Sequence, residues 1–94
     1  MPSIKNVQRK IRRVEGFEAI FLHLDGHDVN DSMEGVPQYP FANAADNYMT
    51  VEDWKRVRFR ENYPGFKVAV LDGVGTSVDF GQTKLVTVRA TYDH

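Results

Sequence analysis

The clearest hydrophobic pattern in the chain lies in residues 17–24, FEAIFLHL. In an extended chain Phe17, Ala19 and Phe21 fall on one face, and the apolar side chains at positions 20, 22 and 24 fall on the other. Apolar residues on both faces are typical of a central strand that is covered on each side. Because one helix covers only one face of a small sheet, we expect a loop or a second subunit to cover the other.

Three further segments show weaker alternation of apolar and polar positions. Residues 7–14 have few apolar members and predict an edge strand, on which basic side chains would discourage unwanted sheet pairing. Residues 66–71, FKVAVL, predict a strand that turns at Asp72-Gly73 into a short return strand over 76–79. Residues 84–92 alternate again and predict the last strand.

One helix is predicted, and it begins at Thr50. The Thr50 hydroxyl can accept the backbone N–H of Asp53, as in a capping box. Val51, Trp54 and Val57 then recur at helical spacing and form one apolar stripe. Pro64-Gly65 ends the helix, and Trp54 is expected to be buried.

Between the strand and the helix, residues 25–48 are rich in Gly, Asp, Asn and Pro and predict a long irregular loop with one short helical turn at 42–46. Its apolar and aromatic residues favour packing against the core. With no internal repeat detected, the order ββ–loop–α–ββ predicts one α+β domain over residues 1–94. We expect an antiparallel sheet of about four to five strands with the helix packed on one face, in a grasp-like arrangement.

The composition suits a globular domain that folds without a cofactor, since 41 % of the 94 residues are hydrophobic and 27 % are charged. The chain has no cysteine, which excludes disulfides, thiolate metal sites and a cysteine nucleophile. No apolar run approaches the ~18 residues of a transmembrane helix. The N-terminus also lacks the apolar core of a signal peptide. We therefore expect a cytoplasmic protein without membrane association.

The charges are arranged in blocks, although the net charge is only −1. Residues 1–14 carry five basic side chains and no acidic one, whereas residues 15–53 carry nine acidic side chains and no Lys or Arg. Residues 54–67 are again basic. Blocks of opposite sign predict ion pairs across the fold or between subunits.

His23, Asp25 and His27 are the candidate metal ligands. On a continuing strand these side chains would point to one side, and two imidazoles with a carboxylate suit Zn²⁺ in a small metal-dependent enzyme. However, Asp25-Gly26 is a common turn dipeptide that would separate them. His23 also shares a face with Phe17 and Phe21, where a packed histidine is ordinary. We therefore expect a packed His23, no cofactor and no catalytic residue.

A candidate ligand pocket lies between the helix and the long loop, where an arginine would hold an anion among aromatic rings. Its residues are Tyr39, Phe41, Tyr48, Trp54 and Arg58. The simpler interpretation is that Trp54 anchors the loop to the core.

The basic N-terminal arm is a candidate for contact with nucleic-acid phosphates. Its residues are Arg9, Lys10, Arg12 and Arg13. The net charge of −1 and the lack of a helix-turn-helix, zinc-finger or aromatic RNA-binding pattern disfavour this interpretation.

The sequence therefore predicts a non-catalytic binding or interaction module of unknown ligand, of the kind found among small bacterial accessory proteins. Apolar residues on both faces of strand 17–24 predict a homodimer or higher homo-oligomer, because a soluble monomer rarely exposes a large apolar patch. A small-molecule or protein partner stays unidentified. The metal-dependent enzyme and the nucleic-acid-binding regulator are the alternatives.

Overall fold

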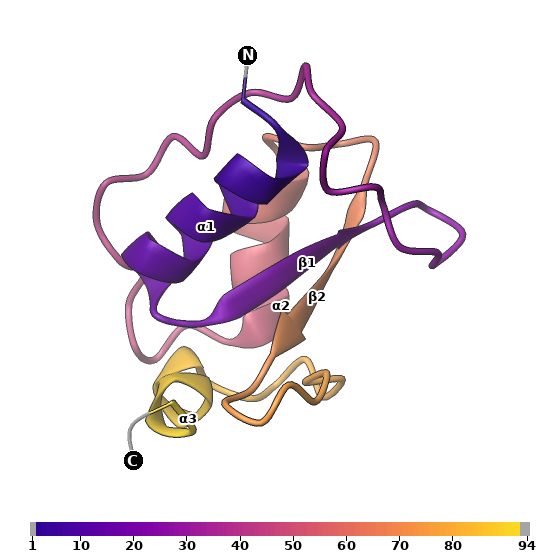
Figure 1. The fold of residues 1–94 in the computed structure, drawn as a ribbon. Coiled ribbons are helices and arrows are strands. Elements are labelled where there is room, and N and C mark those ends of the chain that lie inside the picture. Colours follow the sequence, from indigo (N-terminus) through magenta and orange to yellow (C-terminus); the bar gives the residue numbers. More distant parts are fainter. Residues whose placement is uncertain (1, 93–94) are drawn as a thin grey trace.

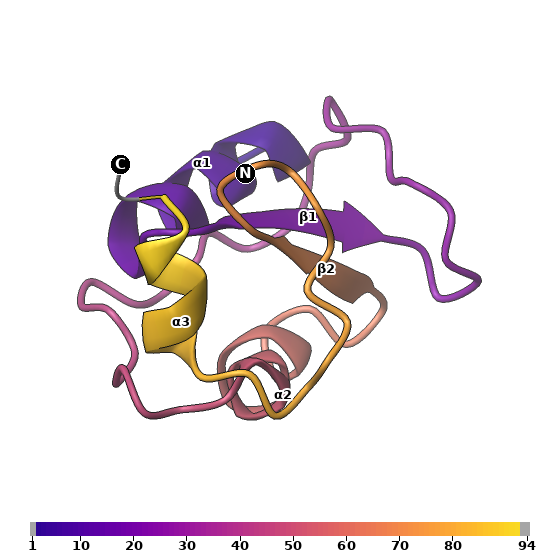
Figure 2. The same cartoon turned by 90° about the horizontal axis from the view of Figure 1, so that it is seen from below.

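The computed structural model describes residues 2–92 and shows an α+β protein whose strands form one antiparallel sheet (Figure 1). Its elements are α1 (Ile4–Glu15), β1 (Glu18–Leu22), α2 (Val51–Trp54), η1 (Lys55–Arg60), β2 (Lys67–Leu71) and α3 (Leu85–Ala90). The π-helical segment η1 continues α2 without a break. Figure 2, seen from below, places α3 beside the end of α1.

The sheet contains two strands within the described residues, so the four- to five-stranded grasp-like sheet is not found. β1 runs antiparallel to β2, with Ile20 opposite Ala69. In both strands the second and fourth residues are buried, and the third and fifth are half-buried. β1 is confirmed as a strand, but it has only one partner and is not the central strand that we predicted.

Residues 7–14 form most of helix α1, so the predicted edge strand is wrong. Ile4, Val7 and Ile11 recur at helical spacing, and all three are buried. The Ser3 hydroxyl caps the helix by accepting the backbone N–H of Asn6 at 3.2 Å. Gly16 ends it with φ at +82°, a conformation that favours glycine.

The helix predicted at Thr50 is confirmed, and Trp54 is fully buried. The Thr50 hydroxyl accepts the backbone N–H of Asp53 at 3.2 Å. Val57 differs from the prediction, because 42 % of it is exposed. The wider turns of η1 place Phe59 rather than Val57 in the core, five residues after Trp54.

The C-terminal third contains less strand than predicted. β2 is confirmed, but its return strand over 76–79 is reduced to a single bridge between Leu71 and Ser77. The strand predicted over 84–92 is wrong, since α3 occupies 85–90 and buries Leu85 and Val88, three residues apart.

The segment between β1 and α2 contains no helix or strand, as predicted for a long loop, and the short helical turn at 42–46 is not found. Val36 and Tyr39 are buried in the core, and Phe41 packs against it. Tyr48 instead lies on the surface with 74 % of its area exposed. The loop therefore covers part of the core that the two strands leave open.

The hydrogen bonds show that the chain follows one path twice. In each half a capped helix leads to a strand, the strand turns back, and the chain returns to the residue that caps the helix. Ser3 pairs with Glu34 in the first half, and Thr50 pairs with Lys84 in the second. The turns match as well, since Leu22 pairs with Asp28 and Leu71 with Ser77.

The backbone N–H groups that tie each return segment down also correspond. Ile4 donates to the Met33 carbonyl and Val51 to the Thr83 carbonyl, both at 2.8 Å. Val29 donates to Phe21, as Val78 does to Val70. The fold is therefore an internal repeat about a pseudo-twofold axis that passes between Ile20 and Ala69.

The expectation of no internal repeat is thus wrong, and a faint signal was present in the sequence. Residues 16–29, GFEAIFLHLDGHDV, align with residues 65–78, GFKVAVLDGVGTSV. The two glycines, the phenylalanine, one leucine and the valine coincide at a spacing of 49 residues. The capping residues Ser3 and Thr50 are 47 residues apart, so the helices align at a spacing of 47 rather than 49. The spacing differs because the connection from helix to strand is longer in the second half.

Candidate functional site

The residues predicted to line an aromatic pocket are mostly built into the core. Trp54 and Tyr39 are fully buried, and the Trp54 indole donates to the Tyr39 hydroxyl at 3.2 Å. The Arg58 guanidinium lies 4.2 Å from the centre of the Phe41 ring. Tyr48 lies elsewhere, beside Lys84. The structure thus brings four of the five together, and their own side chains fill the space between loop and helix.

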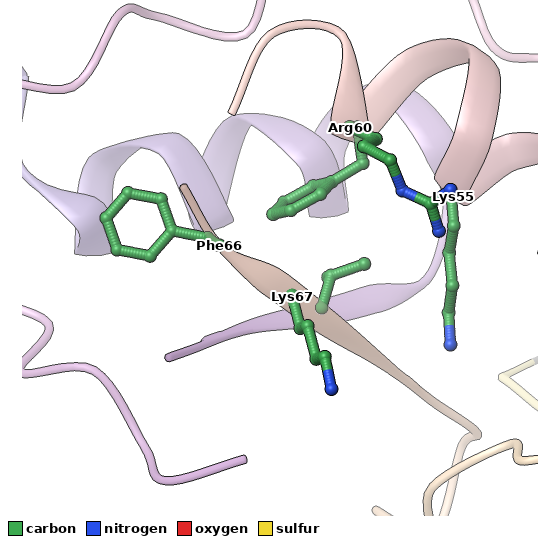
Figure 3. Close-up of a pocket in the computed structure, with 6 residues that line it drawn as sticks. Lys55, Arg60, Phe66 and Lys67 are labelled. Atoms are coloured by element: carbon green, nitrogen blue, oxygen red, sulfur yellow. The ribbon is translucent and has the colours of Figure 1, made fainter. Parts of the chain in front are cut away.

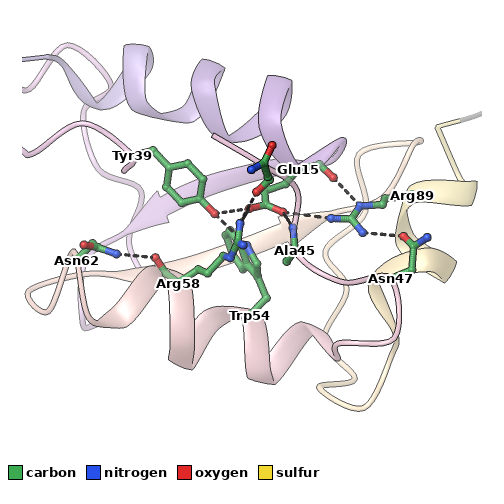
Figure 4. Close-up of polar contacts among 9 residues, drawn as sticks. Glu15, Tyr39, Ala45, Asn47, Trp54, Arg58, Asn62 and Arg89 are labelled. Atoms are coloured by element: carbon green, nitrogen blue, oxygen red, sulfur yellow. Dashed lines mark hydrogen bonds and ion pairs between the residues drawn. The ribbon is translucent and has the colours of Figure 1, made fainter. Parts of the chain in front are cut away.

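Arg58 does hold an anion, but that anion is the buried carboxylate of Glu15 (Figure 4). Glu15 accepts hydrogen bonds from Arg58 at 2.8 Å, from Arg89 at 3.1 Å and from the Tyr39 hydroxyl at 2.5 Å. The backbone N–H of Ala45 donates at 2.8 Å to Oε1 of Glu15, the oxygen that Arg89 also contacts, whereas Arg58 and Tyr39 contact Oε2. Arg89 also donates from Nε to the Glu15 carbonyl at 2.6 Å.

This network joins α1, the loop, η1 and α3 around one carboxylate whose side chain has no exposed surface. Burial raises the pKa of Tyr39, and its hydrogen bond to Glu15 raises it further. A carboxylate sealed from solvent and satisfied by four donors is suited to holding segments together rather than to chemistry on a substrate.

The predicted metal ligands are only partly brought together. The chain turns back at 24–26, where the His23 N–H donates to the His27 carbonyl at 2.8 Å. The Nδ1 atom of His27 lies 2.9 Å from a carboxylate oxygen of Asp25. The hydrogen bond from His27 lowers the pKa of Asp25. Within residues 2–92 no three His, Cys, Asp or Glu side chains are grouped so that they could hold a metal ion. His23 is exposed, so its predicted packing is wrong.

The basic arm is one face of α1 rather than a strand. In the described chain no acidic group lies within ion-pair distance of Arg9, Lys10, Arg12 or Arg13. Arg12 stacks on Tyr92, with its guanidinium carbon 4.6 Å from the ring centre. The predicted pairing of the first two charge blocks inside one chain is therefore not found at these residues.

Two surface hollows lie at corresponding places in the two halves, each between a helix and the free edge of its strand. The first-half groove has a volume of about 320 Å³ and is lined by α1, β1 and Asp31. The second-half groove has a volume of about 180 Å³ and is lined by η1, the start of β2 and Phe66 (Figure 3). Gln8 in the first groove corresponds to Lys55 in the second, and Glu18 corresponds to Lys67.

The second-half groove is the more basic of the two. Lys55, Arg60 and Lys67 line it together with Phe59, Phe66 and Val68, and no acidic residue lines it. The first-half groove contains Lys5, Arg9 and Arg12, but Glu18 and Asp31 offset much of their charge. Burial lowers the pKa of Lys55. The nearby carboxylates of Asp79 and Glu52 act in the opposite direction and raise this pKa, whereas the charge of Arg60 lowers it.

Sequence reasoning missed the second-half groove because its cations come from two elements. Lys55 and Arg60 lie on the helix and Lys67 on the following strand, so their convergence depends on how the strand packs beside the helix. The basic block at 54–67 was the available signal, and it was interpreted as one side of an internal charge pair.

No helix in the described part of the chain is long and apolar enough to cross a membrane. No protein-family model matches the chain, and comparisons with curated proteins and with solved structures find no match.

Proposed function

We propose that the protein is a non-catalytic interaction module that self-associates through the open face of its sheet. The observation that carries the proposal is that the apolar side chains on that face are only partly buried. Ile20, Leu22, Ala69 and Leu71 alternate with the buried residues of the two strands and stay half-buried. Apolar surface of this kind is typical of a contact with another chain.

The turns that follow the strands carry further exposed apolar residues. Leu24 is 59 % exposed and Val74 is 79 % exposed. Antiparallel strands place the two turns at opposite ends of the sheet, so an exposed apolar residue lies near each end. A face that is symmetric about its own centre is well suited to a twofold contact between identical chains.

The charges favour a second copy of this chain as the occupant. The cations of α1 border the open face, because Arg9, Arg12 and Ile20 line the same first-half groove. The acidic residues of the loop, such as Asp28 and Glu34, have no Lys or Arg within ion-pair distance in the described chain. A partner copy would place its acidic loop beside the cations of α1 and its own cations beside the acidic loop of the first chain, and these contacts would fix the register.

Sedimentation equilibrium at micromolar concentration tests the proposal. We expect a species heavier than the 10.8 kDa monomer, and we expect high salt to weaken it. Ile20→Glu places a charge at the centre of the face and should yield monomer at the same concentration. Val86→Glu is the matched control, since Val86 is 40 % exposed on α3, and it should leave the association unchanged.

Circular dichroism and Trp54 fluorescence are the checks that both variants fold. A wild-type protein that sediments as a monomer at every concentration and salt would overturn the proposal. Equal loss of association in both variants would show that the contact is not the open face.

A further inference from the structure

We propose that the second-half groove is a binding site for a small phosphate monoester carried on a flat apolar group. The site borders the face proposed for self-association, because Lys67 pairs with Leu22 at the end of the sheet. It rests on different observations, the lining of the groove and the strand edge beside it.

The cations of the groove converge from the two elements that enclose it. Figure 3 shows Lys55 and Arg60 at one end of the groove and Phe66 at the other, with Lys67 between them along β2. Within residues 2–92 none of the three cations has a carboxylate within 4.0 Å. Three positive charges with no ion-pair partner favour a dianion, which a phosphate monoester provides near neutral pH and a carboxylate does not.

The apolar end of the groove suits a ring. Phe59 is 2 % exposed and Val68 is 7 % exposed, so both form a fixed floor. Phe66 is held by Phe21, whose ring centre lies 5.4 Å away at an edge-to-face angle of 68°. A flat apolar group can therefore pack against Phe66 while its phosphate reaches the cations. A volume of about 180 Å³ limits the ligand to a small molecule.

The free edge of β2 adds a backbone donor. Val70 accepts the N–H of Val78 and Asp72 donates to Thr76, so alternate residues of β2 direct their backbone groups away from β1. Val68 lies two residues earlier and directs its N–H to the same edge, where the described chain offers no acceptor. A phosphate oxygen in the groove can accept this N–H in addition to the charged donors.

The first-half groove serves as an internal comparison. Where the second half has Lys67 and Lys55, the first half has Glu18 and Gln8. Gln8 is already engaged, because its side-chain oxygen accepts the Phe21 N–H at 2.9 Å. With Glu18 and Asp31 in its lining, this groove is not expected to hold a dianion.

Nuclear magnetic resonance titration with phenyl phosphate tests the site on the full chain. We expect saturable shifts at Phe66, Lys67 and Val68, with weaker binding of inorganic phosphate, which lacks the ring, and of benzoate, which carries one charge. Lys67→Glu and Lys55→Gln each give the second groove a residue of the first. We expect Lys67→Glu to weaken binding at least tenfold and Lys55→Gln severalfold. Arg9→Glu, in the first-half groove, is the matched control and should leave the affinity unchanged.

Three results would overturn the site: no saturable binding at 10 mM phenyl phosphate, equal weakening by Arg9→Glu, or shifts confined to α1. Equal affinity for benzoate would reject the phosphate and identify a carboxylate as the ligand group. Lys67 and Arg9 are both exposed, so we expect both variants to stay folded, and their amide spectra test this.

Discussion

Replacing Glu15 by alanine should be the most damaging single change to a polar residue in this protein. The substitution leaves the Tyr39 hydroxyl, the Ala45 N–H and two guanidinium groups without their acceptor. A buried donor left without a partner costs about 1–3 kcal/mol. The Arg58 and Arg89 side chains are 17 % and 18 % exposed, so each can recover part of its hydration.

Breaking one side of a buried ion pair costs about 3–5 kcal/mol in total. A domain of this size is stabilised by about 5–14 kcal/mol, so Glu15→Ala removes a large part of its stability. The change also leaves a small cavity next to Tyr39, which acts in the same direction.

Urea unfolding followed by Trp54 fluorescence measures the effect, because the indole lies in the same network. We expect the midpoint to fall by about 2–4 M. Arg58→Ala should cost less, and a double-mutant cycle should show the two changes to be strongly non-additive, since they remove one shared contact. A loss below about 1 kcal/mol for Glu15→Ala would refute the role assigned to the network.

Two further predictions concern backbone packing and alkaline pH. Gly73→Ala should destabilise the protein by about 1–3 kcal/mol or more, because a Cβ atom there would lie 1.9 Å from the Thr91 carbonyl oxygen. Gly65→Ala meets no atom within 4 Å and should be nearly neutral, so similar thermal midpoints for the two variants would contradict this packing. Burial raises the pKa of Tyr39 and Tyr63 above their ordinary value, so their contribution to stability is complete below about pH 10 and declines as pH rises beyond it. Urea midpoints measured from pH 8 to 12 should fall above pH 10. Ionisation of Tyr39 and Tyr63, followed at these residues by nuclear magnetic resonance, should accompany unfolding, and tyrosinate formation at either residue in the folded protein would exclude its burial.

The features that the sequence predicted correctly depend on local signals. The helix at Thr50 follows from a hydroxyl cap and from Trp54 three residues after Val51. β2 follows from alternation over six residues bounded by Gly65 and by Asp72-Gly73. In both segments the residues that specify the element are neighbours along the chain.

Errors arose where apolar residues fit two periods. In the N-terminal segment Val7 and Ile11 are four residues apart, which suits both a strand and a helix. Including Ile4 would have favoured the helix, because Ile4 and Val7 are three residues apart. In the last segment Val86 and Val88 alternate, yet the buried pair is Leu85 and Val88. Six residues are too few for either period to dominate.

The hydrogen-bond network around Glu15 could not be predicted, because its residues are distant in sequence. Glu15 and Arg89 are separated by 74 positions, and Glu15 and Arg58 by 43. The aromatic residues predicted beside Arg58 do lie there, but nothing local to Glu15 distinguishes it from the other acidic residues of its block. Which acid is buried is decided by the fold as a whole.

The internal repeat explains why the burial of Glu15 in particular matters. The backbone hydrogen bonds of the two halves correspond, but the residue before Gly16 is Glu15, whereas the residue before Gly65 is Pro64. One half therefore carries a carboxylate that the other lacks, and its donors come from the loop, from η1 and from α3. A buried charge is satisfied in only one arrangement of these segments, and any exchange of the two similar halves would leave it unpaired. We therefore assign the network to specificity as well as stability: it directs a chain with two similar halves toward one packing.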